Sequence, residues 1–206
     1  MKKHLLLFII LLLCISTVEA QNYGTPKKVN TQFGVKAGVN LSNINNGSNI
    51  DLSSSMKIGF NVGAVVNLHF GYLNDASDVG TGLFGLQAEL LYSSQGFKCD
   101  DTNISLNYIT LPIMAKFYVS KGFNIEAGPY FSYLISTSPE TAVVGSTQVG
   151  ISDLNGGMDA GVGVGLGYEL RSGLNFGARY NLGLSDVANN LLWKNNGIAI
   201  SIGYLF

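Results

Sequence analysis

The chain has 206 residues and a formal net charge of −1, and only 12% of its residues are charged, against about 25% in soluble globular proteins. A near-neutral charge lacks the basic character that nucleic-acid binding requires, so no nucleic acid is expected among its partners. Apolar residues make up 47% of the chain, which also holds 26 glycines, 10 tyrosines and 11 phenylalanines. This composition indicates that much of the surface faces something other than water.

The first twenty residues have the pattern of a secretory signal. A basic start, Met1–His4, precedes an apolar run over Leu5–Ile15, and small residues follow up to Ala20. The pattern predicts cleavage between Ala20 and Gln21. The alternative is a membrane-anchoring helix, but the apolar run is shorter than the ~20 residues that a bilayer span needs. Residues 1–20 are therefore predicted to be a signal peptide.

The mature chain divides into a short polar periplasmic leader, 21–31, and a single β-domain, 32–206. In the β-domain apolar side chains recur at every second position, which is the period of a strand. No later run is long enough for a spanning helix, so a closed β-barrel is the structure that fits an exported, charge-poor chain. The eight predicted strands are 33–42, 57–70, 84–95, 104–119, 123–136, 159–170, 174–184 and 198–206.

The lengths of the connections predict how the barrel lies in the membrane. Two connections are tight turns, 120–122 and 171–173, which are typical of the periplasmic side. Those at the opposite end are longer, and only the linker Gly71–Gly82 is unusually long for a periplasmic turn. The predicted external loops are Asn43–Ser55, Lys98–Asn103, Thr137–Gly157 and Asp186–Asn196. The fold class is therefore all-β, an eight-stranded antiparallel up-and-down transmembrane barrel, integral to the outer membrane of a Gram-negative bacterium and in contact with its lipid.

The main rival is a soluble lipocalin-like barrel, which would need a charged outer face and an apolar interior. Here the charged residues share one face with glycines, and such a face is too sparse to be a solvated surface, so the lipocalin-like barrel is disfavoured. The three-residue turn 120–122 sets a register that places Lys116 opposite Glu126, and the second turn places Arg179 opposite Gly165. Charges of both signs suit a self-neutralising plug. A water-filled selective pore is the alternative. The predicted lumen network consists of Lys36, Glu89, Lys116, Glu126, Glu169 and Arg179, with Lys57 and Asp159 also on this face.

Two prolines fall in predicted strands where no free edge exists, and Pro112 and Pro129 are expected to cause a local bulge. His69 is the only histidine after the signal peptide. With Asp75 or Asp78 it would be the one available pair for hydrolysis, but a satisfied or solvent-facing histidine is the favoured interpretation. No catalytic, cofactor-binding or metal-ligating residue is predicted, and the protein is expected not to be an enzyme.

The carboxyl terminus and one loop suggest partners. Tyr204 and the terminal Phe206 match the aromatic last strand that barrel-assembly machinery recognises during insertion. In the last external loop, Trp193 follows two leucines. An exposed tryptophan of this kind is a candidate anchor for a protein partner, or else an interfacial residue at headgroup level. The external loops are therefore the predicted place of any protein interaction.

Five further motifs lie along the mature chain: 89–96, 108–116, 126–130, the glycine-rich run ending at Tyr168, and 179–186. Together they resemble the PorT-type outer-membrane β-barrel proteins. The resemblance implies an eight-stranded outer-membrane barrel. The founding member is associated with secretion to the cell surface, which gives one functional hypothesis, an accessory component of a secretion or assembly system. The first hypothesis remains a non-enzymatic barrel that contributes to envelope structure or surface interaction through its loops.

Overall fold

A computed structural model describes the chain over residues 29–46, 54–70, 84–99, 102–138, 141–144, 147–150, 157–185 and 193–206. The predicted cleavage site at Ala20 and Gln21 and the linker acids Asp75 and Asp78 lie outside these residues. Within the described part of the chain, no helix is long and apolar enough to cross a bilayer.

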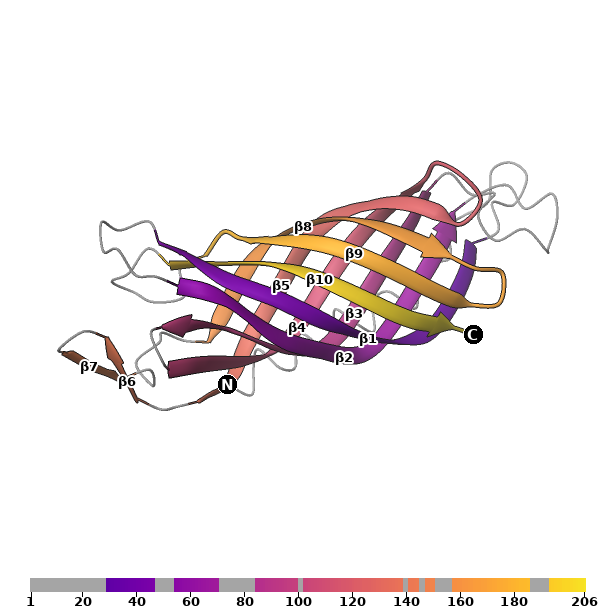
Figure 1. The fold of residues 1–206 in the computed structure, drawn as a ribbon. Coiled ribbons are helices and arrows are strands. Elements are labelled where there is room, and N and C mark those ends of the chain that lie inside the picture. Colours follow the sequence, from indigo (N-terminus) through magenta and orange to yellow (C-terminus); the bar gives the residue numbers. More distant parts are fainter. Residues whose placement is uncertain are drawn as a thin grey trace, which may run out of the picture.

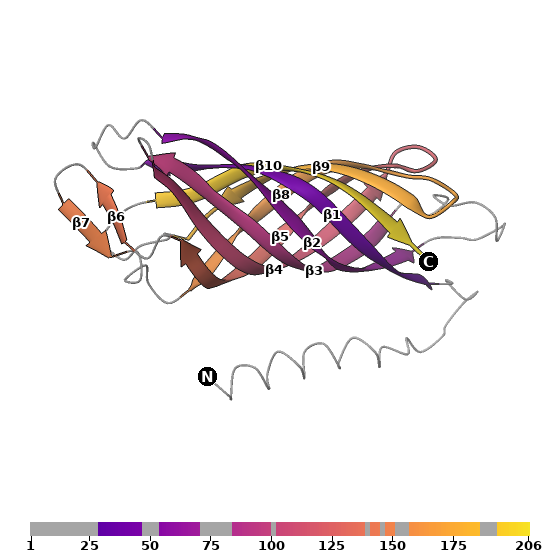
Figure 2. The same ribbon diagram turned by 60° about the horizontal axis from the view of Figure 1, so that its bottom comes forward.

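Eight of the ten described strands form one closed antiparallel barrel, and this confirms the predicted fold class (Figure 1). The first strand pairs with both the second and the last, so the barrel has no free edge along its length. Figure 2 shows the strands crossing the barrel at a marked tilt. The barrel strands are β1 (Val29–Asn46), β2 (Ser54–Phe70), β3 (Phe84–Cys99), β4 (Thr102–Tyr118), β5 (Phe123–Ser138), β8 (Met158–Glu169), β9 (Leu174–Gly183) and β10 (Trp193–Leu205).

The two tight turns set the registers that the sequence predicts. Lys116 lies opposite Glu126 across β4 and β5, and Arg179 lies opposite Gly165 across β9 and β8. Gly122 and Gly173 close these turns with φ values of 80° and 91°, a left-handed conformation that glycine adopts without steric cost. The end of the barrel that carries both turns is called the short-turn end below, and the opposite end is called the long-loop end. Short turns are typical of the periplasmic side.

Several element boundaries differ from the prediction. β1 continues to Asn46 inside the predicted loop Asn43–Ser55, and β3 and β4 leave only residues 100–101 of the predicted loop Lys98–Asn103 between them. β1 starts at Val29, inside the predicted leader. Its backbone pairs there with Phe70 of β2, and such pairing does not require apolar and polar side chains to alternate. Trp193 begins β10 and pairs with Asn46, so it belongs to a strand rather than to a free loop. The predicted loop Thr137–Gly157 contains a small separate hairpin. Its strands are β6 (Thr141–Val144) and β7 (Thr147–Gly150).

The bulge predicted at Pro112 and Pro129 is wrong. Pairing of β4 with β3 lapses beside Pro112, and pairing of β4 with β5 lapses beside Pro129, but both resume in the same register. A proline removes one ladder donor, and the strand tolerates that loss without inserting a residue. The register of β4 and β5 shifts instead between Asn107 and Tyr108.

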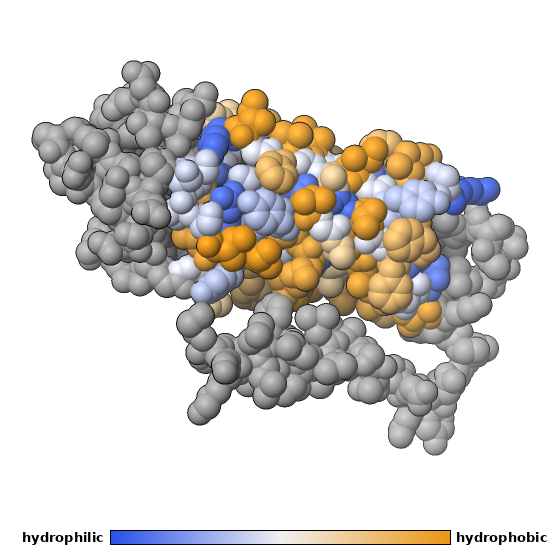
Figure 3. All heavy atoms as spheres, turned by 90° about the horizontal axis from the view of Figure 1, so that it is seen from below, coloured by the Kyte–Doolittle hydropathy of each residue, from blue (hydrophilic) through white to orange (hydrophobic). Residues whose placement is uncertain are grey.

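The outer wall is apolar along the barrel strands (Figure 3). Near the short-turn end it carries a ring of aromatic side chains, with one from each barrel strand. Rings of this kind mark the membrane interface of outer-membrane barrels. The members of this aromatic ring are Phe33, Phe70, Phe84, Phe117, Phe123, Tyr168, Phe176 and Tyr204.

Candidate functional site

The lumen is the best-defined polar site, and the strand period builds it. Every second side chain points inward, and glycines at several of these positions on β8 leave room for long side chains from other strands. Tyr130 lies against Gly161, where an added Cβ would come within 2.5 Å of the phenol oxygen. The side chain of Arg179 lies against Gly163, and that of Glu126 lies against Gly165. Large residues thus fill the space that small ones leave, as expected in an eight-stranded barrel.

Glu89 is the centre of a first charged cluster and is only 1% exposed. It accepts hydrogen bonds from Lys36 Nζ at 2.7 Å and from Arg179 Nη2 at 2.7 Å and Nη1 at 3.3 Å. The Nε of Arg179 donates to Glu126 at 2.7 Å. One guanidinium therefore joins two carboxylates on β3 and β5, an arrangement that its planar fork of donors favours.

Glu169 is the centre of a second cluster, nearer the short-turn end. Lys116 Nζ donates to it at 2.7 Å, and His69 Nε2 lies 3.1 Å from its second oxygen. The hydroxyl of Tyr118 donates to Glu169 at 3.1 Å and lies 2.8 Å from His69 Nε2. Asn67 donates at 3.4 Å. Side chains from β2 and β4 thus converge on one carboxylate of β8.

Gln87 joins the two clusters. Its amide nitrogen donates to Glu89, and its amide oxygen accepts from Lys116. The six charged residues expected in the lumen therefore lie in one buried network, called the charged layer below, with three cations, Lys36, Lys116 and Arg179, against three carboxylates, Glu89, Glu126 and Glu169.

The direct ion pair expected between Lys116 and Glu126 is replaced by other partners, although the two residues face each other in register. Lys116 bonds to Glu169 on β8, and Glu126 bonds to Arg179 on β9. Register fixes where the Cα atoms lie, but in a narrow closed barrel a long side chain can reach a strand that is not adjacent to its own. His69 is likewise drawn into the network rather than left facing solvent.

The long-loop half of the lumen consists mostly of uncharged polar groups, but it also holds buried Asp159, which accepts from Ser185 Oγ at 2.6 Å, and half-buried Lys57, which donates to Ser105. Asn40 donates to Ser93 at 3.0 Å and accepts from Asn61 at 2.6 Å. Thr110 and Ser132 lie 2.9 Å apart. A cavity of about 50 Å³ lies among these groups and reaches down to the charged layer. Ligand pockets typically have volumes of about 300–1,000 Å³, so this cavity has room only for water or a very small molecule.

The sequence placed these amide and hydroxyl side chains on the inner face, but no network among them was predicted. The available signal was the recurrence of Asn40, Asn61, Ser93 and Thr110 at inward positions of four consecutive strands.

The one histidine of the β-domain is enclosed. His69 is 8% exposed, and its neighbours are Glu169 and Tyr118. Within the described part of the chain, no three His, Cys, Asp or Glu side chains are grouped to hold a metal ion.

The carboxyl terminus completes the barrel seam. Phe206 N donates to Phe33 O at 2.8 Å, and the rings of Tyr204 and Phe206 lie 6.0 Å apart on the outer wall. Phe206 is 70% exposed, so its ring faces the surroundings of the barrel rather than its interior. Both aromatic residues are thus available to lipid or to another protein.

A closed antiparallel barrel with an apolar wall, an aromatic ring and a filled polar lumen defines an integral outer-membrane protein that sits in the lipid bilayer. Comparison with known families agrees. The chain belongs to the family of outer membrane protein β-barrel domains, whose model matches residues 20–189.

One solved structure shows the same fold at low sequence identity, and others are similar to a lesser degree. Neisserial surface protein A (NspA) is similar with a TM-score of 0.54 and 14% identity, covering 86% of this chain and 99% of that one. Ail, the attachment invasion locus protein of Yersinia pestis, has a TM-score of 0.48, 14% identity and the same coverage of 86% and 99%. OprG from Pseudomonas aeruginosa has a TM-score of 0.36 and 10% identity, covering 85% and 95%. No curated protein matches the sequence.

Proposed function

We propose that this protein is a non-enzymatic outer-membrane barrel that acts at the cell surface through its long-loop end. The observation that carries the proposal is the unequal length of its strands. β1 to β5 have 16 to 18 residues, whereas β9 has 10. At about 3.3 Å per residue and a tilt of about 40°, ten residues span about 25 Å, the height of the apolar band.

Strands of sixteen residues span about 40 Å by the same estimate, so β1 to β5 project about 15 Å beyond the band. The side chains of β4 and β5 agree with this. Ten residues beyond Phe117 of the aromatic ring, the outward positions become polar, and Asn107 donates to Ser136 at 3.1 Å in an exposed pair. The projecting sheet holds the connection that contains β6 and β7 clear of the lipid.

The lumen favours a surface role over transport. The charged layer takes side chains from six strands, and each of its carboxylates is bonded to at least one cation. A solute on this route would have to displace buried ion pairs, whose separation is costly. The enclosed His69 likewise supports a structural role for the one histidine of the β-domain rather than a catalytic one.

The test is a trimmed variant in a strain lacking the native gene. Residues 139–156 are replaced by a short turn, which keeps Ser138 and the bond from Leu134 N to Gly157 O. The barrel is expected to fold while surface adhesion and envelope resistance to detergent are lost. Trimming of the linker 72–82 at the short-turn end is the matched control and is expected to change neither. Full activity of the 139–156 variant would contradict the proposal for this loop.

A second candidate rests on the PorT-type motifs, of which 108–116 lies on β4 and 126–130 on β5. It assigns the protein to a secretion or assembly system as an accessory component. In the same deletion strain, loss of exported proteins from the cell surface, restored by the wild-type gene, would favour this role. Unchanged secretion together with lost adhesion would favour the first.

The two ends of the chain suggest how the protein is exported and inserted into the membrane. We infer that residues 1–20 are removed, so that Edman sequencing of the outer-membrane protein should begin at Gln21. Tyr204 and the exposed Phe206 are inferred to engage barrel-assembly machinery. Deletion of Phe206 should lower the assembled, heat-modifiable protein in membranes at equal synthesis, and undiminished assembly would show that the aromatic ending is incidental.

A further inference from the structure

The exposed charges of the barrel are distributed unevenly. Every acid whose side chain the structure describes is buried in the lumen, at Glu89, Glu126, Asp159 and Glu169. Among the charged side chains described in the same ranges, the exposed ones are Lys121 and Arg171. Both are cations, and both lie in the short-turn end.

The two cations lie on neighbouring turns. Glu169 N donates to Gly122 O at 2.8 Å, and Phe123 pairs with Tyr168. Continuing that register by two residues brings Lys121 beside Leu170, one residue from Arg171. Each of the two side chains has a further contact of its own, and neither is buried. The adjacent turns therefore present two positive groups within the reach of one ligand.

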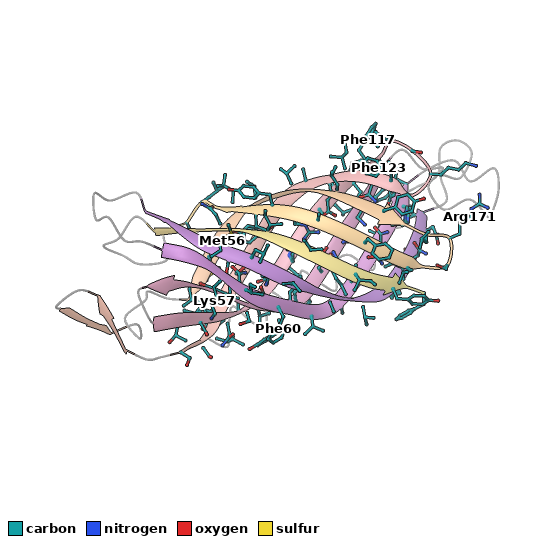
Figure 4. The ribbon with its side chains drawn as sticks, in the orientation of Figure 1. Met56, Lys57, Phe60, Phe117, Phe123 and Arg171 are labelled. Atoms are coloured by element: carbon teal, nitrogen blue, oxygen red, sulfur yellow. The ribbon has the colours of Figure 1, made fainter. Side chains whose placement is uncertain are left out.

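An aromatic wall lies directly next to these turns. Phe123 and Tyr168 are a cross-strand pair, with 36% and 45% of their surfaces exposed, and Phe117 and Phe176 are their neighbours in the aromatic ring. Figure 4 shows Arg171 extending from the short-turn end, with Phe117 and Phe123 on the wall at that end. Two cations at headgroup level above an apolar aromatic surface match an amphiphile with an anionic head and acyl chains.

We propose that Lys121 and Arg171, together with the wall at Phe123 and Tyr168, form a binding site for an anionic phospholipid of the periplasmic leaflet. The guanidinium of Arg171 can hold two phosphate oxygens, and the ammonium of Lys121 supplies a second charge without fixed geometry. The acyl chains lie along the two rings. A phospholipid with a net negative head gains from both cations, whereas in a zwitterionic one the amine offsets that gain.

The experiment is native mass spectrometry of the full mature barrel, purified in detergent and mixed with phosphatidylglycerol, with phosphatidylethanolamine or with inorganic phosphate. Phosphatidylglycerol is expected to remain bound about tenfold more than phosphatidylethanolamine. The double variant Lys121→Ser/Arg171→Ser should lose this preference. The double variant Ser120→Ala/Ser172→Ala alters the same two exposed turns without changing charge and should keep it.

Three results would overturn the site: equal retention of the two lipids, an unchanged preference in the Ser variant, or displacement of the lipid by millimolar inorganic phosphate, which would indicate a site for the free ion. The swap Lys121→Arg/Arg171→Lys guards against misfolding of the uncharged variant. The swapped variant retains both charges and should retain the preference for phosphatidylglycerol. If this variant lost that preference, the proposal would likewise be overturned.

Discussion

The two halves of the lumen are built from different chemistry. Toward the short-turn end, the charged layer holds three cations and three carboxylates in contact, with Gln87 joining its two clusters. Toward the long-loop end, amides and hydroxyls such as Asn40 and Ser93 surround a cavity of about 50 Å³. The charged half depends on ion pairs that fail together. The long-loop half, apart from Asp159 and Lys57, is held by neutral hydrogen bonds, each of which contributes less.

Removal of Arg179 should have the largest effect, because this one side chain bonds both Glu89 and Glu126. Arg179→Met leaves two buried carboxylates short of a partner, and we expect the free energy of unfolding to fall by about 3–5 kcal/mol. Urea titration in lipid vesicles measures it. Arg179→Lys keeps the charge and should lose less. A loss below about 1 kcal/mol for Arg179→Met would mean that the charged layer does not hold the barrel together.

Double-mutant cycles would sharpen the partner assignment within the charged layer. Lys116→Met combined with Glu169→Gln should show a coupling energy of about 1–3 kcal/mol, because these groups are in contact. Lys116→Met combined with Glu126→Gln should show a smaller coupling energy, because these two groups face each other in the same network without bonding directly. A larger coupling in the second cycle would restore the cross-strand pair and reject the cross-lumen one.

Glycine substitutions test how closely the lumen is filled. A Cβ at Gly161 would lie 2.5 Å from Tyr130 and 2.3 Å from a backbone oxygen, so Gly161→Ala should cost about 1–3 kcal/mol of unfolding free energy. At Gly177 the nearest atom would be Ser201 Oγ at 3.1 Å, with the next at 3.9 Å. Gly177→Ala is the control, and equal losses in the same urea titration would show that this part of the lumen is loosely filled.

The smallest effect is expected in the long-loop half. Ser93→Ala removes one acceptor of Asn40, whose amide nitrogen keeps Phe60 O at 3.2 Å and Ser94 O at 3.1 Å. The unfolding free energy should therefore fall by less than about 1 kcal/mol. A loss comparable to that of Arg179→Met would remove the distinction between the two halves.

The alternation of side chains and the two tight turns were enough to predict the barrel, its strand order and the registers of Lys116 and Arg179. They act locally, through the strand period and the geometry of three-residue loops. The contacts inside the lumen were not predictable in this way. Lys116 on β4 reaches past β5 to Glu169 on β8, and a contact between strands that are not adjacent depends on how the whole barrel closes.

Predictions from local composition were also wrong for some segments. Asn, Ser and Gly residues around Asn46 suggest a loop, yet β1 continues to Asn46 because β10 pairs with it there. The uncharged stretch that forms β6 and β7 has no alternating pattern long enough to mark a hairpin. The prolines were expected to force a bulge, but the neighbouring ladder bonds keep the register of β4 at Pro112.

We propose that the charged layer closes the lumen, so that the protein acts at its surface and not as a pore. Planar-bilayer recording of the purified wild-type barrel tests this proposal most directly. We expect no conductance steps above the bare membrane from the wild-type barrel. Glu89→Ala, which removes the shared partner of Lys36 and Arg179, should give measurable steps. Stable ion-conducting steps from the wild-type barrel would contradict the proposal.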